Sequence, residues 1–211
     1  MSFGMPKCER FGQSAAVLFC EETGPLVQRR LWPVAREAAR WNGVIEAVPA
    51  AGNLTLIFDR HAVDFESLAE RLLHAWATCE RDDAPGRAVE IAVRYDGPDL
   101  QNVARLCAIS VDRVIELHAS VEYAVSFIGF APGFAYLDGL DARLRVPRLA
   151  QPRSRVPAGS VAVAGSQSAV YPFDSPGGWQ LIGHTETVMF DPVRDPAALL
   201  QPGDRVRFAA V

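Results

Sequence analysis

Hydrophobic positions in the first part of the chain follow two patterns, one typical of helices and one typical of strands. Val27, Leu31, Val34 and Ala38 recur at helical spacing and predict a helix over 25–41, with Pro25 in its first turn. A second helix is predicted to begin at Asp64 and to bury one face, formed by Phe65, Leu68, Ala69, Leu72, Leu73 and Trp76. Short apolar runs predict strands at 14–20, 44–49, 54–59 and 89–95.

These elements follow the order β-α-β-β-α-β, which predicts a ferredoxin-like N-terminal domain over residues 1–87. The polar, turn-rich segment 81–87 is the predicted connection to a second domain, 88–211.

The second domain has a different pattern. Pro98 and Asp99 begin a predicted helix that reaches about Ile109, and Ser110 is the predicted N-cap of another that ends near Leu117. Short strands between glycine and proline turns are then predicted at 121–130, 159–165, 168–171, 179–183, 187–191 and 204–209. Many short strands with this punctuation indicate a barrel or a sandwich, so the whole chain is expected to be an α+β protein.

Composition excludes several classes of function. The chain has 211 residues, 49% of them hydrophobic and 22% charged, and a net charge of −4, which argues against a general nucleic-acid surface. No apolar run approaches the ~20 residues of a membrane span, and no signal-peptide pattern opens the chain. Four scattered cysteines, none in a Cys-x-x-Cys pair, indicate reduced thiols in a cytoplasmic protein and no metal site.

The only lysine is Lys7, and the other basic residues are arginines. A P-loop places a lysine on the nucleotide phosphates, so this chain is expected to lack a Walker-type ATP site. An amidase with a serine–lysine mechanism is excluded for the same reason. Ser160 and Ser175 have no neighbouring base in the sequence, so no nucleophile is evident.

Glycines, prolines and aromatic residues alternate in three segments, 127–137, 147–161 and 175–185. Because glycine allows left-handed backbone and proline fixes φ, this alternation predicts rigid, shaped loops. Such loops either form a binding site or turn the corners of a barrel, and the pattern alone leaves both interpretations open.

Histidines and arginines supply the candidate chemistry. His118 and His184 border the glycine-rich motifs and are the candidate acid or base, whereas His61 and His74 are expected to be exposed. Three arginines among prolines could bind an anion, or form salt bridges to Asp138 and Asp141; they are Arg148, Arg153 and Arg155.

These motifs, in this order, resemble the B subunit of bacterial ATP-dependent 5-oxoprolinase, a family also known as allophanate hydrolase subunit 1 or Kip-type kinase inhibitors. The resemblance rests on His118, Gly-Phe-Ala-Pro-Gly-Phe-Ala-Tyr-Leu at 129–137, the 147–161 segment, and Ser-Pro-Gly-Gly-Trp-Gln-Leu-Ile-Gly-His-Thr at 175–185. Tyr-Asp-Gly-Pro-Asp-Leu at 95–100 and Pro-Gly-Asp at 202–204 fit it too, so it covers roughly residues 14 to 210.

The resemblance implies a cyclophilin-like β-barrel and an enzyme that couples ATP hydrolysis to opening the lactam of 5-oxoproline. It implies an ATP site shared with a homologue of the C subunit of 5-oxoprolinase, with a homologue of the A subunit bound more loosely. Since the family carries other residues at the position of His184, a lining role is expected for that side chain. The expected lining of the site also includes Phe134, Tyr136, Arg148, Arg153, Gln167, Tyr171, Gly177, Gly178, Trp179 and Thr185.

Two other functions remain open at this level. A Kip-type binding module would inhibit a sensor histidine kinase by contact alone. A carboxyltransferase-like half-domain of urea or allophanate metabolism would need a biotin carrier from another protein.

Overall fold

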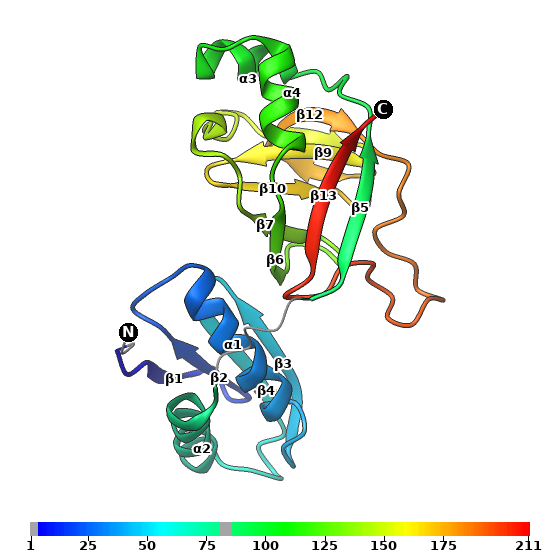
Figure 1. The fold of residues 1–211 in the computed structure, drawn as a ribbon. Helices are drawn as coiled ribbons and strands as arrows, with labels where there is room; N and C mark the ends of the chain where they lie inside the picture. Colours follow the sequence, from blue (N-terminus) through cyan, green and yellow to red (C-terminus); the bar gives the residue numbers. More distant parts are fainter. Residues whose placement is uncertain (1–3, 81–85) are drawn as a thin grey trace. The chain divides into compact units, whose positions relative to one another are not determined.

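The computed structural model describes residues 4–80 and 86–211, and the chain divides after Ala84 into two compact units (Figure 1). Each unit has its own hydrophobic core. Part of the predicted connection, 81–85, lies outside the described residues.

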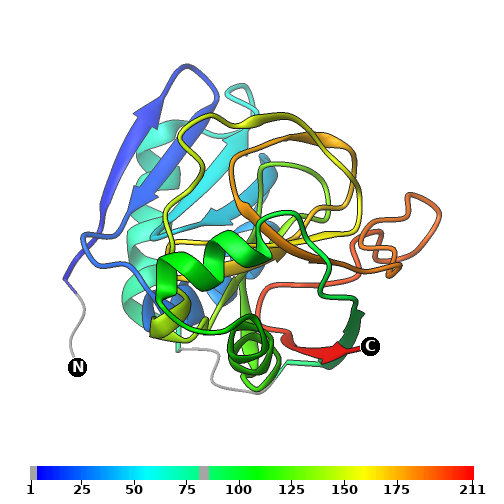
Figure 2. The same ribbon diagram turned by 90° about the horizontal axis from the view of Figure 1, so that it is seen from above.

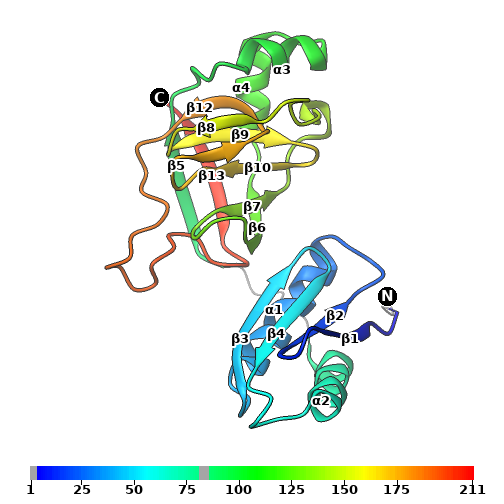
Figure 3. The ribbon, with the colours of Figure 1, turned by 180° about the vertical axis from the view of Figure 1, so that it is seen from behind.

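The first unit is a four-stranded antiparallel sheet with two helices on one face. The strand order is β1-β2-β4-β3, with β1 at Lys7–Phe11, β2 at Ala15–Phe19, β3 at Val44–Ala50 and β4 at Asn53–Phe58. Helices α1 (Pro25–Ala38) and α2 (Phe65–Thr78) pack on the face that carries Leu18, Leu54 and Leu56 (Figure 3).

Local signals account for both helices. Pro25 occupies the first turn of α1, and the predicted inner face of Val27, Leu31, Val34 and Ala38 is buried. The Asp64 side chain caps α2 by accepting a 2.8 Å hydrogen bond from the Ser67 amide. The helix α1 is shorter than predicted because it ends at Ala38, three residues before Trp41.

The ferredoxin-like arrangement is not confirmed. The strand predicted to complete it, β5 (Ala88–Val93), belongs to the second unit and pairs in parallel with β13 (Arg205–Ala210). Arg87 fixes this pairing, since its amide and its Nε each lie 3.2 Å from Asp204 Oδ1. The first unit instead gains the unpredicted strand β1 beside β2.

The second unit is a seven-stranded sheet in the order β12-β9-β10-β7-β6-β13-β5 that curls into a nearly closed barrel. Two backbone hydrogen bonds between Arg94 and His184, at 2.8 and 2.9 Å, join its outer strands β5 and β12. The other strands are β6 (Tyr123–Ile128), β7 (Ala135–Asp138), β9 (Ser160–Ala164), β10 (Gln167–Val170) and β12 (Gln180–His184).

Two helices and a small second sheet complete this unit. Helices α3 (Leu100–Cys107) and α4 (Val111–Ala119), nearest the viewer in Figure 2, bury side chains in the core with residues from all seven strands. Ser110 caps α4 as predicted, by accepting from the Arg113 amide. A separate two-stranded antiparallel sheet pairs β8 (Arg153–Val156) with β11 (Ser175–Gly177), two strands that are separated in the chain by β9 and β10.

The strand prediction was incomplete for the short elements. Strands β7, β8 and β11 were not predicted, and each has three or four residues. The predicted strand at 187–191 is wrong, because this segment forms only an isolated bridge between Phe190 and Ala198. It belongs to a long loop between β12 and β13.

Candidate functional site

An aromatic cluster lies on the outer face of the barrel. Side chains alternate along β9, so that Val161 and Val163 enter the barrel core while Ala162 and Ala164 join a second cluster on the opposite face. This second cluster, called here the aromatic wall, contains three of the predicted lining residues in its core and one at its edge: Phe134, Tyr171, Trp179 and Tyr136.

The rings of the wall pack edge to face. The ring centroid of Phe134 lies 5.2 Å from that of Tyr171 and 5.8 Å from that of Trp179. Tyr136 is 5.9 Å from Trp179 and stacks on Phe127 at 4.3 Å. Phe134 and Tyr171 are each 1% exposed, so the wall is a packed support and leaves no room for a ligand between its rings.

The two-stranded sheet β8–β11 packs at the edge of the wall. Gly177 pairs with Arg153, and a side chain on Gly177 would clash with the hydroxyl of Tyr171. Gly178 accepts a 2.7 Å hydrogen bond from the Leu149 amide through its carbonyl. Burial raises the pKa of Tyr171, although the Trp179 amide donates to its hydroxyl and opposes that shift. Gly177 therefore lets the backbone approach the phenol closely.

Arg148 is the exposed cation of this site. Its guanidinium lies 5.7 Å from the centroid of the Trp179 ring, at cation–π distance. Burial raises the pKa of Tyr136, and the positive charge of Arg148 partly offsets that rise. Within the part of the chain that the structure describes, no carboxylate pairs with Arg148. The site thus offers a cation beside the phenol of Tyr136.

Arg153 is arranged differently. Its NH2 group lies 2.7 Å from Asp99 Oδ1, while the other oxygen of Asp99 accepts from the Leu181 amide at 2.7 Å. The second terminal nitrogen of Arg153, NH1, is buried without a hydrogen-bond partner among the described residues. Arg153 therefore joins β8 to the start of α3, and it is less open to a ligand than Arg148.

The acids proposed as alternative partners of the arginines have other contacts. Asp138 accepts a 2.8 Å hydrogen bond from Gln167, and Asp141 pairs with Arg143. Arg155 pairs with Asp174. The salt-bridge interpretation is therefore correct for two of the three arginines, but with different acids. Gln167 lies on the same strand face as Tyr171, with its amide used inside the protein.

His118 lies in the barrel core and is fully buried. Its Nε2 is 2.8 Å from Ser168 Oγ, and its Nδ1 is 2.8 Å from the Tyr95 hydroxyl. Because Ser168 donates its single hydrogen to the Ala162 carbonyl, the imidazole must donate from Nε2 and accept at Nδ1. Burial lowers its pKa to about 3, so His118 is neutral and structural here, and no ligand can reach it without opening the core.

His184 and Thr185 lie in a separate hollow. Its volume is about 310 Å³, and its lining also includes Ala92, Arg94, Glu186, Thr187 and Val211. His184 Nε2 is 3.4 Å from Glu186 Oε1, and the buried hydroxyl of Thr185 contacts that of Thr187 at 3.1 Å. The aromatic wall contributes no side chain to this hollow, so these two predicted residues are not brought together with Arg148.

Sequence reasoning missed two participants. Asp99 was assigned only as a helix start, yet its carboxylate orients Arg153 and the Leu181 backbone. Phe130 packs its ring 5.3 Å from that of Phe134, and its left-handed φ of 67° could not be predicted for a phenylalanine. Elsewhere, the described residues contain no cluster of His, Cys, Asp and Glu suited to a metal ion, and none of their helices is long and apolar enough to cross a membrane.

Comparison with known proteins identifies first the class of domain to which this chain belongs and then its family. Residues 6–200 match the family described as "Carboxyltransferase domain, subdomain C and D". A protein of Escherichia coli O157:H7, named as the B subunit of 5-oxoprolinase, is 47% identical over 210 residues, 96% of this chain and 94% of that protein. One of the same name from Bacillus subtilis is 39% identical over 220 residues, 96% of this chain and 92% of that protein. The chain therefore belongs to the B-subunit family of 5-oxoprolinase.

Solved structures support the fold. The protein TTHA0988 superimposes with a TM-score of 0.82 at 41% identity over 93% of this chain, which spans only 40% of that longer chain. Urea carboxylase of Kluyveromyces lactis has a TM-score of 0.78 over 98% of this chain and 22% of that one. At 20% identity, this second likeness concerns the fold alone.

Proposed function

We propose that the chain is the B subunit of an ATP-dependent 5-oxoprolinase, which converts 5-oxo-L-proline, ATP and water into L-glutamate, ADP and phosphate. The observation that carries this proposal is the identity of 39–47% to proteins named as the B subunit of 5-oxoprolinase over nearly the whole chain. With ATP as co-substrate, we expect it to act in the cytoplasm.

The chemistry of the substrate fits the exposed groups of the candidate site. At neutral pH 5-oxoproline carries one carboxylate and a lactam, which is a resonance-stabilised amide. Arg148 could bind the carboxylate through its guanidinium. The Trp179 ring, which lies against the Arg148 guanidinium, would limit the movement of that guanidinium. The Tyr136 hydroxyl stays protonated because burial raises its pKa, so it could donate to an oxygen of the substrate.

Ring opening requires activation of the lactam. Transfer of the γ-phosphoryl group of ATP to the lactam oxygen releases ADP and makes that oxygen a leaving group. Water then adds to the same carbon and the carbon–nitrogen bond of the ring breaks, which leaves glutamate with its side-chain carboxyl group phosphorylated. A second water hydrolyses this acyl phosphate and releases glutamate and phosphate. The nitrogen takes up a proton as the ring opens.

We propose that a second protein supplies what this chain lacks for these steps. The only lysine is Lys7, so a P-loop is missing, and the serines near the site have no evident activating base. A C-subunit homologue would share the ATP and substrate site, and an A-subunit homologue would bind more loosely.

Reconstitution tests the proposal. The chain should be purified with its C-subunit and A-subunit homologues, and glutamate release measured with ATP and 5-oxoproline. We expect release only when all three proteins and both substrates are present, and none from this chain alone. Turnover by the chain alone would contradict the proposal, and so would a complete mixture that is inactive.

The alternative functions give different results in the same assay. A carboxyltransferase half-domain would need biotin-dependent carboxylation of a urea-like acceptor. A kinase-inhibiting module would bind a sensor histidine kinase and leave 5-oxoproline untouched.

A further inference from the structure

The loop from Gly129 to Phe134 holds a large exposed aromatic residue in a strained conformation. Phe130 has a φ of 67°, and the Ala131 amide donates a 2.8 Å hydrogen bond to the Gly129 carbonyl across it. A hydrogen bond between residues two apart across a left-handed residue defines the rare classic γ-turn. Glycine would be expected at such a position, yet a phenylalanine that is 62% exposed occupies it.

Further hydrogen bonds fix the loop in this shape. The Phe134 amide donates to the Ala131 carbonyl at 3.0 Å around Pro132 and Gly133, and the Gly129 amide donates to the Phe134 carbonyl at 3.1 Å. The edge of the Phe130 ring packs on Phe134 and Tyr171, with centroids 5.3 and 6.4 Å away. Strain that is held in place by so many contacts commonly marks a functional position.

The exposed aromatic surface continues onto two other loops. A Cβ on Gly133 would lie 2.8 Å from the Cβ of Phe190, so the two backbones are in close contact. The ring of Phe190 lies 5.5 Å from that of Phe173, which is 39% exposed. Phe130, Pro132, Phe173 and Phe190 together form what is called here the Phe130 surface.

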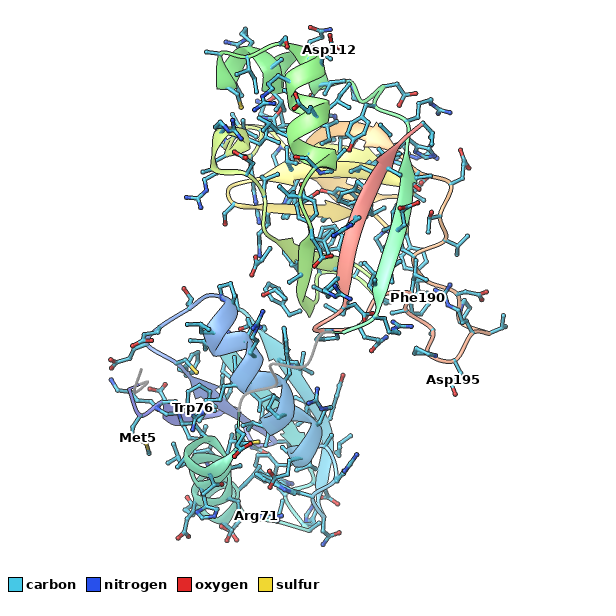
Figure 4. All side chains as sticks on the ribbon, in the orientation of Figure 1. Met5, Arg71, Trp76, Asp112, Phe190 and Asp195 are labelled. Carbon is cyan, nitrogen blue, oxygen red and sulfur yellow. The ribbon has the colours of Figure 1, made fainter. Side chains whose placement is uncertain are left out.

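The loop that carries Phe190 is also held rigidly. The guanidinium of Arg194 donates to the backbone carbonyls of Val188, Met189, Pro196 and Ala197. The Asp191 amide donates to the Ala197 carbonyl, and the Leu199 amide to that of Met189, which closes the loop on itself. Figure 4 shows Phe190 at its inner part and Asp195 at its outer tip.

We propose that the Phe130 surface is the docking site for the C-subunit homologue. A small molecule fits it poorly, because Phe130 is exposed and the rings of Phe134 and Tyr171 beneath it are 1% exposed, which leaves no space between them. A rigid aromatic surface instead favours binding to another protein, since little conformational entropy is lost on association.

The choice of the C-subunit homologue as the partner rests on the proposed function and on the position of Phe130 next to the candidate substrate site. Relatives at 39–47% identity are named as one subunit of an enzyme, and more than half of the TTHA0988 chain lies outside the region similar to this one. Phe130 contacts Phe134, which contacts Trp179 beneath Arg148. A protein seated on Phe130 would therefore adjoin the candidate substrate site and could complete it.

Binding measurements with the full chain test this surface. The dissociation constant for the purified C-subunit homologue should be measured for the wild type and for Phe130→Ala and Phe173→Ser. We expect each variant to weaken binding at least tenfold, as is common for exposed aromatic residues at the centre of an interface. Phe11→Ala is the matched control, because Phe11 is 73% exposed in the first unit, and it should change affinity less than twofold.

The outcomes separate this inference from the proposed function. If the wild type binds the C-subunit homologue and both variants bind equally well, the docking site is wrong even when the reconstituted enzyme is active. If the variants lose binding but the intact complex has no 5-oxoprolinase activity, the docking site stands and the proposed function fails. A concentration-dependent dimer of the wild type that Phe130→Ala abolishes would assign the surface to a second copy and overturn the proposal.

Discussion

Gly177 lies so close to Tyr171 that any side chain at position 177 would clash with the tyrosine hydroxyl, whereas one at Gly178 would make only ordinary contacts, 3.6 Å from Pro152. The two glycines of the Gly-Gly-Trp segment therefore have different roles. Gly177 allows the β8–β11 sheet, in which it pairs with Arg153, to lie close against the aromatic wall.

This difference gives a paired prediction. Gly177→Ala should displace Tyr171 and destabilise the chain by about 1–3 kcal/mol, the usual cost of overpacking a rigid site. Gly178→Ala should have less effect on the midpoint of urea unfolding. Equal effects of the two substitutions would mean that the β8–β11 sheet can shift to make room for a side chain at position 177 and does not position the wall.

Sequence reasoning succeeded where the signal was local. The helical spacing of Val27, Leu31 and Val34 and the caps at Asp64 and Ser110 specify elements through neighbouring residues, and the structure contains them. The partner of β5 could not be predicted in this way. Its alternation shows that it is a strand, but its neighbour β13 is more than a hundred residues away along the chain.

In the candidate site, too, the features specified by neighbouring residues were predicted and those that depend on the fold were not. The Gly–Pro–aromatic composition indicated rigid loops, and the structure brings Phe134, Tyr136, Tyr171 and Trp179 together. It could not indicate that His118 points into the barrel, because the position of a residue near a motif does not say whether its side of helix α4 packs on the barrel. The Asp99–Arg153 pair was hidden for a similar reason, since it joins segments that only the fold brings together.

The buried His118 should make stability depend on pH. Its pKa is about 3 in the folded protein, below the ordinary value of 6.5 that it regains on unfolding. Only the unfolded chain takes up this proton as the pH falls below 6.5, so the stabilising contribution is complete above 6.5 and is lost towards pH 3. The loss is about 1.4 kcal/mol per pH unit from this one group.

Urea unfolding at pH 7 and pH 5 would measure this effect. His118→Gln keeps an amide donor for Ser168 but cannot titrate, so its stability should fall less between the two pH values than that of the wild type. His74→Gln makes the same substitution at an exposed position and is the control variant. A slope that His118→Gln leaves unchanged would show that the histidine is protonated in the folded protein.

Asp99 should be the most sensitive polar residue of the second unit. Asp99→Ala leaves the Arg153 guanidinium and the Leu181 amide without their acceptor, and we expect a loss of about 3 kcal/mol in the free energy of unfolding. Arg153→Ala should cost less, because the carboxylate keeps the Leu181 amide. The exposed pair Arg155–Asp174 provides the control, and Arg155→Ala should leave the melting temperature nearly unchanged.

Arg148 should affect the reaction and not the fold. If its guanidinium binds the substrate carboxylate, Arg148→Ala should raise KM for 5-oxoproline in the reconstituted enzyme about tenfold to a hundredfold, the range expected for charged hydrogen bonds. Arg148→Lys should recover only part of this loss, since an ammonium cannot form the bidentate contact. Arg145→Ala, at an exposed arginine three residues earlier in the chain, is the control. A normal KM for Arg148→Ala would remove Arg148 from the site.

The strain at Phe130 can be measured in the isolated chain, independently of any partner. At most exposed positions glycine is less favourable than alanine because the unfolded chain gains entropy, but a left-handed φ reverses the order, since alanine meets steric strain there. We therefore expect Phe130→Gly to be more stable than Phe130→Ala by up to about 1 kcal/mol in urea unfolding. The same two substitutions at Phe173, which has no positive φ, should rank in the usual order. If alanine were the more stable residue at both positions, the γ-turn would not be strained, and conformational strain would no longer support a role for Phe130 in binding.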